Sequence, residues 1–390
     1  MNINITSRLF ITFFIALFCN PIEVFSQVLT NTTSISITKT WSQQPNGYTY
    51  PITISVPIGT PPEGGFPVCI LLHGNGGAGS SFISQYINTL QCHILVAPSG
   101  YLNSWNICAE NSDAPDVEMA NDLVNILQGY ANINADKIRI LGSSNGASLA
   151  NRIFIENTNP GVDIVCAVVS HLADALYRNG NFYKPSSTTT SSSAYCGYDM
   201  MVNPWPTRKY LSISNTNDGV IPYNGGMFAG LNFLPAETAA YNIANYKGYT
   251  GSQLNSGTAI GAGNTAITEY SYLSGDVVHV KGTAQHSINA TQKAYIKSYF
   301  SDCDEDLGIE NYDLAKVEVF PNPVSNVLNI KVDAVLIGKI FSIYDNLGRN
   351  IFVGKLNSEI SNINIAELNK GVYFLIVEGE LNQVIKVIKE

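Results

Sequence analysis

The residues best suited to chemistry form a short serine motif flanked by glycines. Residues 142–146 read GSSNG, a G-x-S-x-G pattern, between an apolar run at 137–141 and a helical pattern that begins at residue 147. In a strand–turn–helix setting this pattern holds its central serine on a tight turn with the hydroxyl exposed. The helix N-terminus behind the serine offers backbone N–H groups to an oxyanion. We therefore predict that Ser144 is a nucleophile and that the Asn145 N–H is an oxyanion donor.

A second glycine-rich segment predicts the other oxyanion donor. Residues 73–77 read HGNGG and directly follow the apolar run at 68–72. Glycines at this point let the backbone approach a substrate carbonyl, and the donor is expected to be the N–H of Gly74 or Asn75. An ordinary glycine-rich turn is the alternative, but the serine motif about 70 residues downstream argues against it. His73 itself is expected to orient the loop.

A nucleophilic serine needs a histidine base, and the base needs an acid that orients it. His286 lies in the loop KGTAQHSINA, where it can reach over the serine, whereas His279 lies within the alternating strand pattern DVVHVKG. Three acids are candidates: Asp218, Glu237 and Asp276. Asp218 is the best placed, because it directly follows a strand pattern. The remaining two histidines, His93 and His171, precede the acid and are interpreted as structural.

Alternating strand and helix patterns must position these residues. Strand-like stretches are predicted at 34–40 and 48–56, further strands at 68–72, 93–97, 137–141, 164–169, 210–214 and 277–280, and helices at 117–130, from 147, at 235–246 and at 290–299. Strands joined by crossover helices predict an α/β fold with a doubly wound, mostly parallel sheet. The near-continuous apolar character of the runs is typical of strands buried on both faces.

The start of the chain predicts export. Arg8 precedes an apolar run at 9–18, which is too short to span a bilayer and fits a signal peptide over residues 1–26. Cys19 allows a lipoprotein as the alternative, although Phe18 stands where a small residue is needed. The net charge of −9 provides no basic groove, so nucleic acid is not expected as a partner.

Six cysteines remain once Cys19 leaves with the signal. Cys69 and Cys166 lie inside apolar strand patterns and are predicted to be buried thiols. The other four are Cys92, Cys108, Cys196 and Cys303. Outside the cytoplasm they could form two disulfides, and the sequence does not choose among the three possible pairings. None has the spacing of metal ligands, and neither a metal nor an organic cofactor is expected.

The pattern changes after residue 303. Residues 304–315 are acidic and short of large apolar side chains, which predicts a linker after a catalytic domain at 27–303. Over residues 316–390, seven short strand patterns separated by turn residues predict a small β-sandwich. They lie at 316–320, 327–332, 340–344, 350–353, 362–365, 372–377 and 384–388.

The order HGNGG, SWN (104–106), LGSSNGAS and NTNDGVIPYNGG, followed by a late loop histidine, resembles the polyhydroxybutyrate depolymerase/feruloyl esterase group of α/β-hydrolases over about residues 45–300. The resemblance implies that Ser144, Asp218 and His286 form the catalytic triad and that Trp105 lies near the substrate cleft. The chain departs from the group's pattern at SNTND (214–218) and at Ser287-Ile288, which leaves acyl and polymer specificity open.

The C-terminal segments VEVFPNPVSNVLNI, IYDNLGRNI and LNKGVYFLIVEG resemble the type A sorting domain of the type IX secretion system. This resemblance implies passage across an outer membrane with the secretion machinery as partner, and a secreted or cell-surface location. A carbohydrate-binding sandwich is the alternative. Against it, the aromatic residues lie mostly in strands and could all be core: Phe320, Phe341, Tyr344, Phe352, Tyr373 and Phe374.

The sequence therefore predicts a secreted serine hydrolase of carboxylic esters. The candidate substrates are feruloyl or acetyl esters of polysaccharides and short aliphatic polyesters such as polyhydroxybutyrate. A secreted serine peptidase of the same fold would use the same three residues, and a non-catalytic surface protein is a third interpretation. Reaction with p-nitrophenyl esters, peptide anilides and a fluorophosphonate probe would distinguish them.

Overall fold

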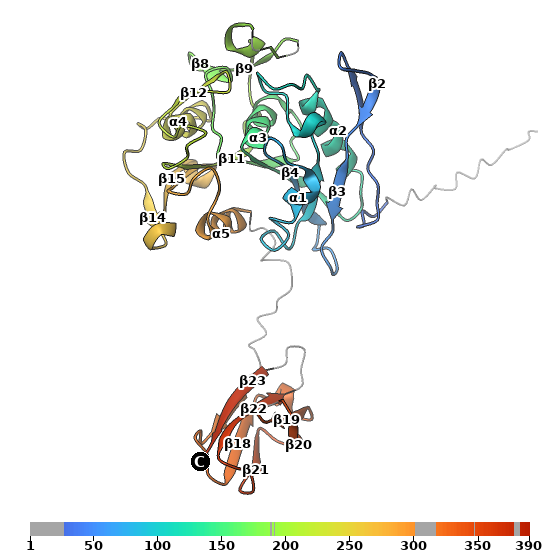
Figure 1. The fold of residues 1–390 in the computed structure, drawn as a ribbon, viewed down its shortest axis with the longest axis vertical. Coiled ribbons are helices and arrows are strands. Elements are labelled where there is room, and N and C mark those ends of the chain that lie inside the picture. The colour runs from blue at the N-terminus through green and yellow to red at the C-terminus, as the bar shows by residue number, and fades with distance from the viewer. Residues whose placement is uncertain (1–26, 188, 191, 301–316, 347, 378–382) are drawn as a thin grey trace, which may run out of the picture. The chain divides into compact units, whose positions relative to one another are not determined.

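The computed structural model describes residues 27–187, 189–190, 192–300, 317–346, 348–377 and 383–390 (Figure 1). The chain divides into two compact units, Met1–Leu307 and Gly308–Glu390. The predicted signal peptide at 1–26 and the predicted linker at 304–315 lie outside the described residues.

The larger unit is built on one nine-stranded sheet. Its six central strands are parallel, and antiparallel strands complete both edges. In spatial order the strands are β3 (Ile52–Ser55), β5 (Ile94–Pro98), β4 (Phe66–Leu72), β6 (Ile133–Ser143), β7 (Val162–Val168), β11 (Lys209–Asn215), β16 (Val277–Gly282), β15 (Ile267–Tyr272) and β14 (Thr258–Ile260). The prediction of an α/β fold with a doubly wound, mostly parallel sheet is confirmed.

Helices cover both faces of this sheet, which explains the continuous apolar runs. On one face, α1 (Gly79–Ile83) and α5 (Ala290–Tyr299) pack on side chains such as Cys69 and Val278. On the other face lie α2 (Asp116–Leu127), α3 (Asn145–Glu156) and α4 (Ala236–Tyr246) (Figure 1). All seven residues of β4 and all five of β5 are buried, as burial on both faces requires.

Several short antiparallel strands lie outside the predicted pattern. They are β2 (Gln44–Thr49), β8 (Tyr177–Arg178) with β9 (Asn181–Pro185) and β10 (Tyr198–Val202), and β12 (Gly226–Phe228) with β13 (Leu231–Phe233). The partner of β2, β1 (Thr38–Trp41), overlaps the stretch predicted at 34–40, and β3 lies within the stretch predicted at 48–56. The sheet strands β15 and β14 are also absent from the predicted set. These segments are short and mostly half-exposed, so they lack the apolar runs that identified the central strands.

The smaller unit is a two-sheet antiparallel β domain, as predicted. One sheet contains β17 (Val317–Phe320), β18 (Val327–Val332) and β21 (Ile360–Asn364). The other contains β20 (Asn350–Lys355), β19 (Ile340–Tyr344), β22 (Gly371–Val377) and β23 (Gln383–Lys389). Apolar side chains from both sheets, such as Leu328 and Leu375, form one core between them. The seven strands coincide with the seven predicted patterns to within a few residues.

The Pro321-Asn322-Pro323 turn contacts the last strand of this domain. The Asn322 side chain donates to the Lys386 carbonyl at 2.7 Å and accepts the Ile388 N–H at 2.9 Å, and both prolines follow cis peptide bonds. The Asn322 amide thus forms hydrogen bonds with the backbone of β23 that a neighbouring strand would otherwise form.

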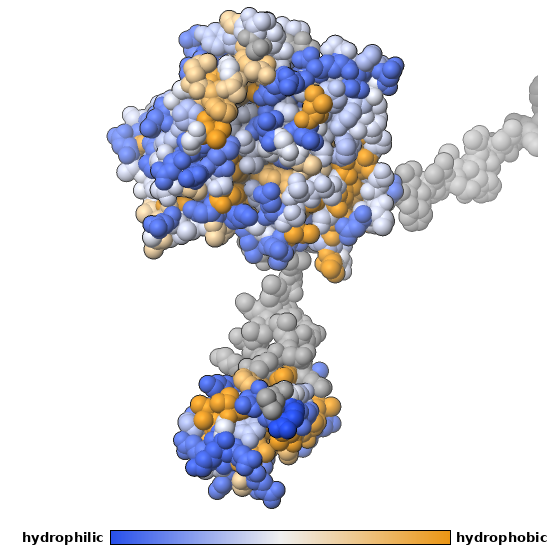
Figure 2. All heavy atoms as spheres, in the orientation of Figure 1, coloured by the Kyte–Doolittle hydropathy of each residue, from blue (hydrophilic) through white to orange (hydrophobic). Residues whose placement is uncertain are grey.

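The expectation that the aromatic residues of this domain are all core is only partly correct. Phe341 and Tyr373 are buried, whereas Phe320, Phe352 and Phe374 are each more than one-third exposed. The last three lie on edge strands or on the outward face of the strand alternation, where the period of two turns their side chains away from the core. Figure 2 shows apolar residues on the visible surface of this unit.

Among the described residues, no helix has the length and apolar character that crossing a membrane requires.

Candidate active site

The turn after β6 holds Ser144 in a strained conformation. Its backbone angles are φ 55° and ψ −120°, and its N–H is bonded to the Val168 carbonyl on β7 at 2.9 Å. A Cβ at Gly142 would lie 2.0 Å from the Gly146 carbonyl oxygen, and one at Gly146 would lie 2.1 Å from the Leu72 oxygen. Both flanking glycines are therefore required by close backbone packing, as the G-x-S-x-G pattern predicted.

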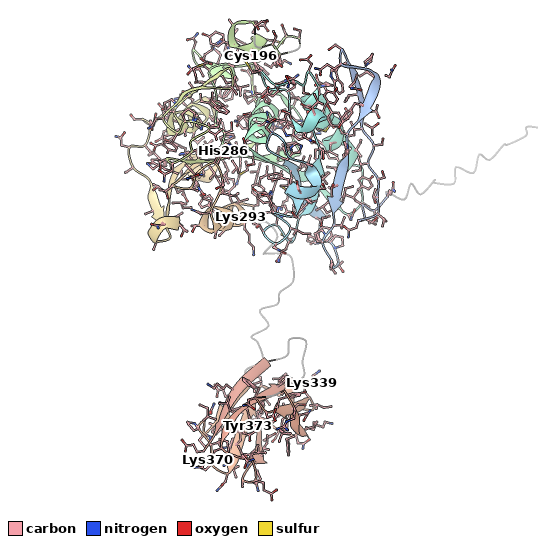
Figure 3. All side chains as sticks on the ribbon, in the orientation of Figure 1. Cys196, His286, Lys293, Lys339, Lys370 and Tyr373 are labelled. Carbon is pink, nitrogen blue, oxygen red and sulfur yellow. A yellow bond between two sulfur atoms is a disulfide. The ribbon has the colours of Figure 1, made fainter. Side chains whose placement is uncertain are left out.

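Ser144, His286 and Asp218 form a continuous hydrogen-bonded chain. The Ser144 Oγ lies 2.7 Å from His286 Nε2, and His286 Nδ1 lies 2.8 and 3.0 Å from the two oxygens of Asp218. Asp218 Oδ1 also accepts the N–H groups of Val220 and Ile221 at 2.8 and 3.0 Å. The Asp218 carboxylate is buried, whereas the ring of His286, which is labelled in Figure 3, is partly exposed and lines a cavity. The three residues meet although 142 positions separate Ser144 from His286.

The other two candidate acids have different partners. Glu237 accepts hydrogen bonds from Lys281 Nζ at 3.0 Å and from Tyr223 at 2.9 Å, and these bonds lower the pKa of its carboxyl against the opposing effect of burial. Asp276 lies 3.9 Å from Lys209 Nζ. The structure therefore brings Asp218, and neither Glu237 nor Asp276, to the His286 ring.

Asn215 is a buried residue at the end of β11 that the sequence analysis did not single out. Its Nδ2 donates to the carbonyls of Gln285 and Ser287 at 3.0 and 2.7 Å, which are the residues on either side of His286. Gln292 on α5 fixes the amide by donating to its Oδ1 at 2.7 Å. Asn215 therefore sets the position of the histidine loop. Its place three residues before Asp218, at the end of a strand, is the sequence signal that could have indicated it.

The HGNGG loop lies against the nucleophile. A Cβ at Gly74 would lie 3.4 Å from the Ser144 Cβ, and Gly74 and Asn75 line the same cavity as Asn145. In the described part of the chain, the backbone N–H groups of Gly74, Asn75 and Asn145 form no hydrogen bond with protein atoms. They therefore remain available to a ligand, as an oxyanion site requires.

His73 orients this loop through hydrogen bonds of its ring, as expected. Its buried ring accepts the Gly100 N–H at Nε2 (3.0 Å), so Nδ1 carries the proton and donates to the Gly74 carbonyl at 2.7 Å. Burial lowers the pKa of the ring, which favours this neutral form.

Trp105 lies near the substrate cleft, as the resemblance implies, but its side chain is not placed to bind a substrate. Its side chain is 0% exposed and does not line the cavity, because its indole N–H is directed inward to the His73 carbonyl at 2.7 Å. The ring packs 4.8 Å from the His73 ring, centroid to centroid. Trp105 therefore braces the HGNGG loop, and its neighbour Ser104 reaches the cavity instead.

The cavity above Ser144 has a volume of about 910 Å³ and a mixed lining. Its apolar lining residues come mostly from the segment that follows Asp218: Val220, Ile221, Phe228, Ala229, Leu231 and Phe233. Its polar lining residues, called the polar wall below, include Ser104, Glu110, Asn111, Ser112, Ser148 and Ser170. The site thus offers a ligand both apolar contacts and hydrogen-bonding groups.

A disulfide joins the polar wall to the insertion between β7 and β11. Cys108 is bonded to Cys196, which lies in the 3₁₀ segment Ala194–Gly197 (Figure 3), and both sulfurs lie 3.8 Å from the Gly230 carbonyl oxygen in the β12–β13 turn. This settles one pair that the sequence left open. Cys92 is also disulfide-bonded, Cys303 lies outside the described residues, and Cys69 and Cys166 are buried free thiols, as predicted.

Removal of this disulfide is expected to loosen the cleft as well as the fold. In a Cys108→Ser/Cys196→Ser variant, the free energy of unfolding should fall by roughly 2–5 kcal/mol, because the bond closes a loop with a sequence separation of 88. KM for a bulky ester should rise more than KM for an acetate ester, because the segments that contain Cys108, Cys196 and Gly230 meet at this bond beside the cavity. Urea unfolding and steady-state kinetics measure the two effects. An unchanged unfolding midpoint would contradict the first.

Three further histidines are buried and neutral. Burial lowers the pKa of His93, His171 and His279 from 6.5 to about 3, 4 and 3, respectively. His279 lies between Ser212 Oγ and Tyr223 Oη, each at 3.0 Å. The interpretation of these residues as structural is consistent with this burial. Asp116 on α2 has the opposite shift, because burial raises the pKa of its carboxyl to about 7.

These shifts predict that the larger unit loses stability in acid. Below pH 6.5 the unfolded chain binds protons at three histidines that stay neutral in the folded protein. Asp116 opposes this, because it is protonated earlier in the folded state. About two protons net are therefore taken up on unfolding near pH 5, and the free energy of unfolding should fall by roughly 2–3 kcal/mol per pH unit there. Urea unfolding at pH 7, 6 and 5 measures the slope. His279→Asn should reduce the slope, because it lowers the number of protons taken up on unfolding by about one. A flat profile would contradict the prediction.

In the part of the chain that the structure describes, no cluster of three or more His, Cys, Asp or Glu side chains could hold a metal ion.

The sheet order, the nucleophile turn after a central strand and the chain order Ser144, Asp218, His286 define the α/β-hydrolase fold. Solved structures similar to this chain include the carboxylesterase of Bacillus cereus (TM-score 0.42, 12% identity, 64% of this chain and 93% of that one) and the acetyl xylan esterase of Aspergillus awamori (0.42, 12%, 64% and 93%). Another is LpqC, a poly(3-hydroxybutyrate) depolymerase of Bordetella parapertussis (0.34, 14%, 51% and 70%). No curated protein matches the chain.

The family model of the secretion system C-terminal sorting domain matches residues 318–390, which is the smaller unit. The resemblance to a type IX sorting domain is thereby confirmed. This domain indicates that the protein is secreted or attached to the cell surface, and it implies interaction with the type IX secretion machinery.

Proposed function

We propose that the larger unit is a serine hydrolase of carboxylic esters with Ser144, His286 and Asp218 as its catalytic triad. The observation that carries the proposal is the hydrogen-bonded chain from Ser144 Oγ through His286 to the buried Asp218, on the floor of an open cavity. His286 Nδ1 faces the Asp218 carboxylate and so carries the proton, which leaves Nε2 free to accept the proton of the Ser144 hydroxyl.

In the first step, Ser144 Oγ attacks the ester carbonyl carbon while His286 Nε2 takes its proton. The oxyanion of the tetrahedral intermediate is bound by the Asn145 N–H and by that of Gly74 or Asn75. The intermediate collapses as His286 returns the proton to the leaving alcohol, and an acyl-enzyme on Ser144 remains. A water molecule that gives its proton to His286 then releases the carboxylic acid.

The mixed apolar and polar lining of the cavity supports candidate substrates that combine an apolar part with a hydrogen-bonding part. Feruloyl and acetyl esters of polysaccharides join an acyl group to a hydroxylated partner, and short aliphatic polyesters repeat an apolar unit around each ester. The export signals fit such substrates, because polymers are degraded outside the cell. The secretion machinery is the proposed partner of the C-terminal domain.

The test is an ester panel on the full-length secreted protein. Methyl ferulate, acetylated xylan, polyhydroxybutyrate and p-nitrophenyl acetate and butyrate are assayed beside peptide anilides, with release of acid or p-nitrophenol as the readout. Hydrolysis of one or more esters without cleavage of anilides is the expected result. Cleavage of anilides alone would overturn the proposal in favour of a peptidase.

A further inference from the structure

The side chain of Asn145, the residue after the nucleophile, is held in one orientation by the main chain of Trp105. Asn145 Oδ1 accepts the Trp105 N–H at 2.8 Å, and Nδ2 donates to the Trp105 carbonyl at 3.1 Å. If the amide were flipped, Oδ1 would face the Trp105 carbonyl oxygen and Nδ2 would face the Trp105 N–H. These two contacts therefore determine the orientation of the amide. A second hydrogen of Nδ2 is therefore directed at whatever lies beyond it, and that atom must be an acceptor.

The acceptor is Glu110 in the polar wall of the cleft. Its Oε1 accepts from Asn145 Nδ2 at 3.0 Å, and its Oε2 accepts the N–H groups of Ile107 and Cys108 at 3.0 and 2.6 Å. Both carboxylate oxygens thus face donors whose orientations are fixed elsewhere. A carboxylate accepts from all three donors at once, whereas an amide would turn an N–H toward one of them.

This carboxylate gives the cleft an unbalanced negative charge. Among the residues that line the cavity, Glu110 is the one acidic residue and His286 is the other ionisable group. The lining contains no Lys or Arg. Arg152 lies behind this wall, where it donates to the Asn106 carbonyl at 2.7 Å, but Glu156 already pairs with it at 2.8 and 3.3 Å. The three donors to Glu110 are neutral, so they hold the charge in place without cancelling it.

We propose that Glu110 is a specificity-determining residue whose fixed charge makes the site select neutral esters over anionic ones and release its carboxylate product. The inference rests on the proposed ester hydrolysis. That reaction turns a neutral ester into a free carboxylate anion in the same cavity, so a negative charge in the cavity lining discriminates between substrate and product. Esters whose acyl chain ends in a carboxylate should be poor substrates for the same reason.

The expected size follows from Coulomb's law. Glu110 contacts the side chain of the residue next to Ser144, so its charge lies on the order of 10 Å from the reacting carbon. With an effective dielectric constant of roughly 20–40, a second negative charge at that distance changes binding by about four- to sixteen-fold. Salt should reduce the effect, because the cleft is open to solvent.

The experiment compares one ester with its charged counterpart in the full-length protein at low ionic strength. The substrates are the p-nitrophenyl methyl diester of adipic acid, which is neutral, and the mono-p-nitrophenyl ester, which carries a free carboxylate. The readout is the ratio of their kcat/KM values, from which any loss of folded protein cancels. Glu110→Gln should lower the neutral-to-anionic ratio by more than about twofold and at most about sixteen-fold, because the free carboxylate can lie up to about 7 Å beyond the reacting carbon, and adipate should inhibit this variant more strongly than the wild type.

Matched variants separate charge from loop structure. Glu110→Asp shortens the side chain and disturbs the same hydrogen bonds but keeps the charge, so its ratio should stay within about twofold of the wild type. Asp136→Asn removes an exposed charge eight residues before Ser144 on β6 and should also leave the ratio unchanged. An unchanged ratio in Glu110→Gln, or an equal shift in Glu110→Asp, would overturn the inference. Failure of the neutral diester to react in any variant would instead contradict the proposed esterase activity.

Discussion

Ser144→Ala should lower kcat on p-nitrophenyl butyrate by roughly five to six orders of magnitude. The variant lacks the oxygen that lies 2.7 Å from His286 Nε2 and would form the acyl-enzyme. Residual activity should come only from a positioned water and the oxyanion donors, so it should not show burst kinetics. Stopped-flow and steady-state release of p-nitrophenol measure both properties.

The adjacent serine provides the control. Ser143 precedes Ser144 in the same turn, and Ser143→Ala should keep activity within about tenfold, because the triad contacts come from Ser144. A fluorophosphonate probe should label the wild type and Ser143→Ala but not Ser144→Ala. Thermal unfolding should show that all three proteins are folded. Full activity of Ser144→Ala in this comparison would disprove the assignment of the nucleophile.

Asp218→Asn should lower kcat by roughly 10⁴-fold while leaving the fold intact. In the native site Asp218 Oδ1 accepts the N–H groups of Val220 and Ile221, so an asparagine would keep its oxygen there and place its NH₂ at the Oδ2 position. That position faces His286 Nδ1 at 2.8 Å. An NH₂ group would donate to Nδ1 and move the ring proton to Nε2, where it blocks acceptance of the Ser144 proton.

Glu237→Gln is the matched control for this prediction. It replaces another carboxylate of the same unit by an amide, but Glu237 bonds to Lys281 and Tyr223 rather than to His286. Its kcat should remain within about tenfold of the wild type, with any loss appearing in thermal stability. Equal losses of kcat in both variants would show that Asp218 has no special role in orienting the histidine.

Local patterns predicted most of the architecture. Strands buried on both faces are continuous apolar runs, and helices that cover a sheet have a 3.6-residue period, so neighbouring residues alone reveal them. The same holds for the nucleophile turn, because its two glycines are required by contacts only a few residues away along the chain or on the next strand. The strands β15 and β14 at one edge of the sheet and the β12–β13 hairpin escaped prediction, since short, half-exposed segments carry no such period.

The sequence by itself determined which residues could act: a serine between glycines, a late loop histidine, an acid after a strand and a C-terminal sorting domain. Only the tertiary structure decided which of them meet. It brought Asp218 rather than Glu237 to His286, paired Cys108 with Cys196, turned Trp105 inward and placed Asn215 and Glu110 around the site. The physical reason is that these contacts join residues far apart in the chain, and their distances depend on how the whole sheet twists and packs rather than on any local pattern.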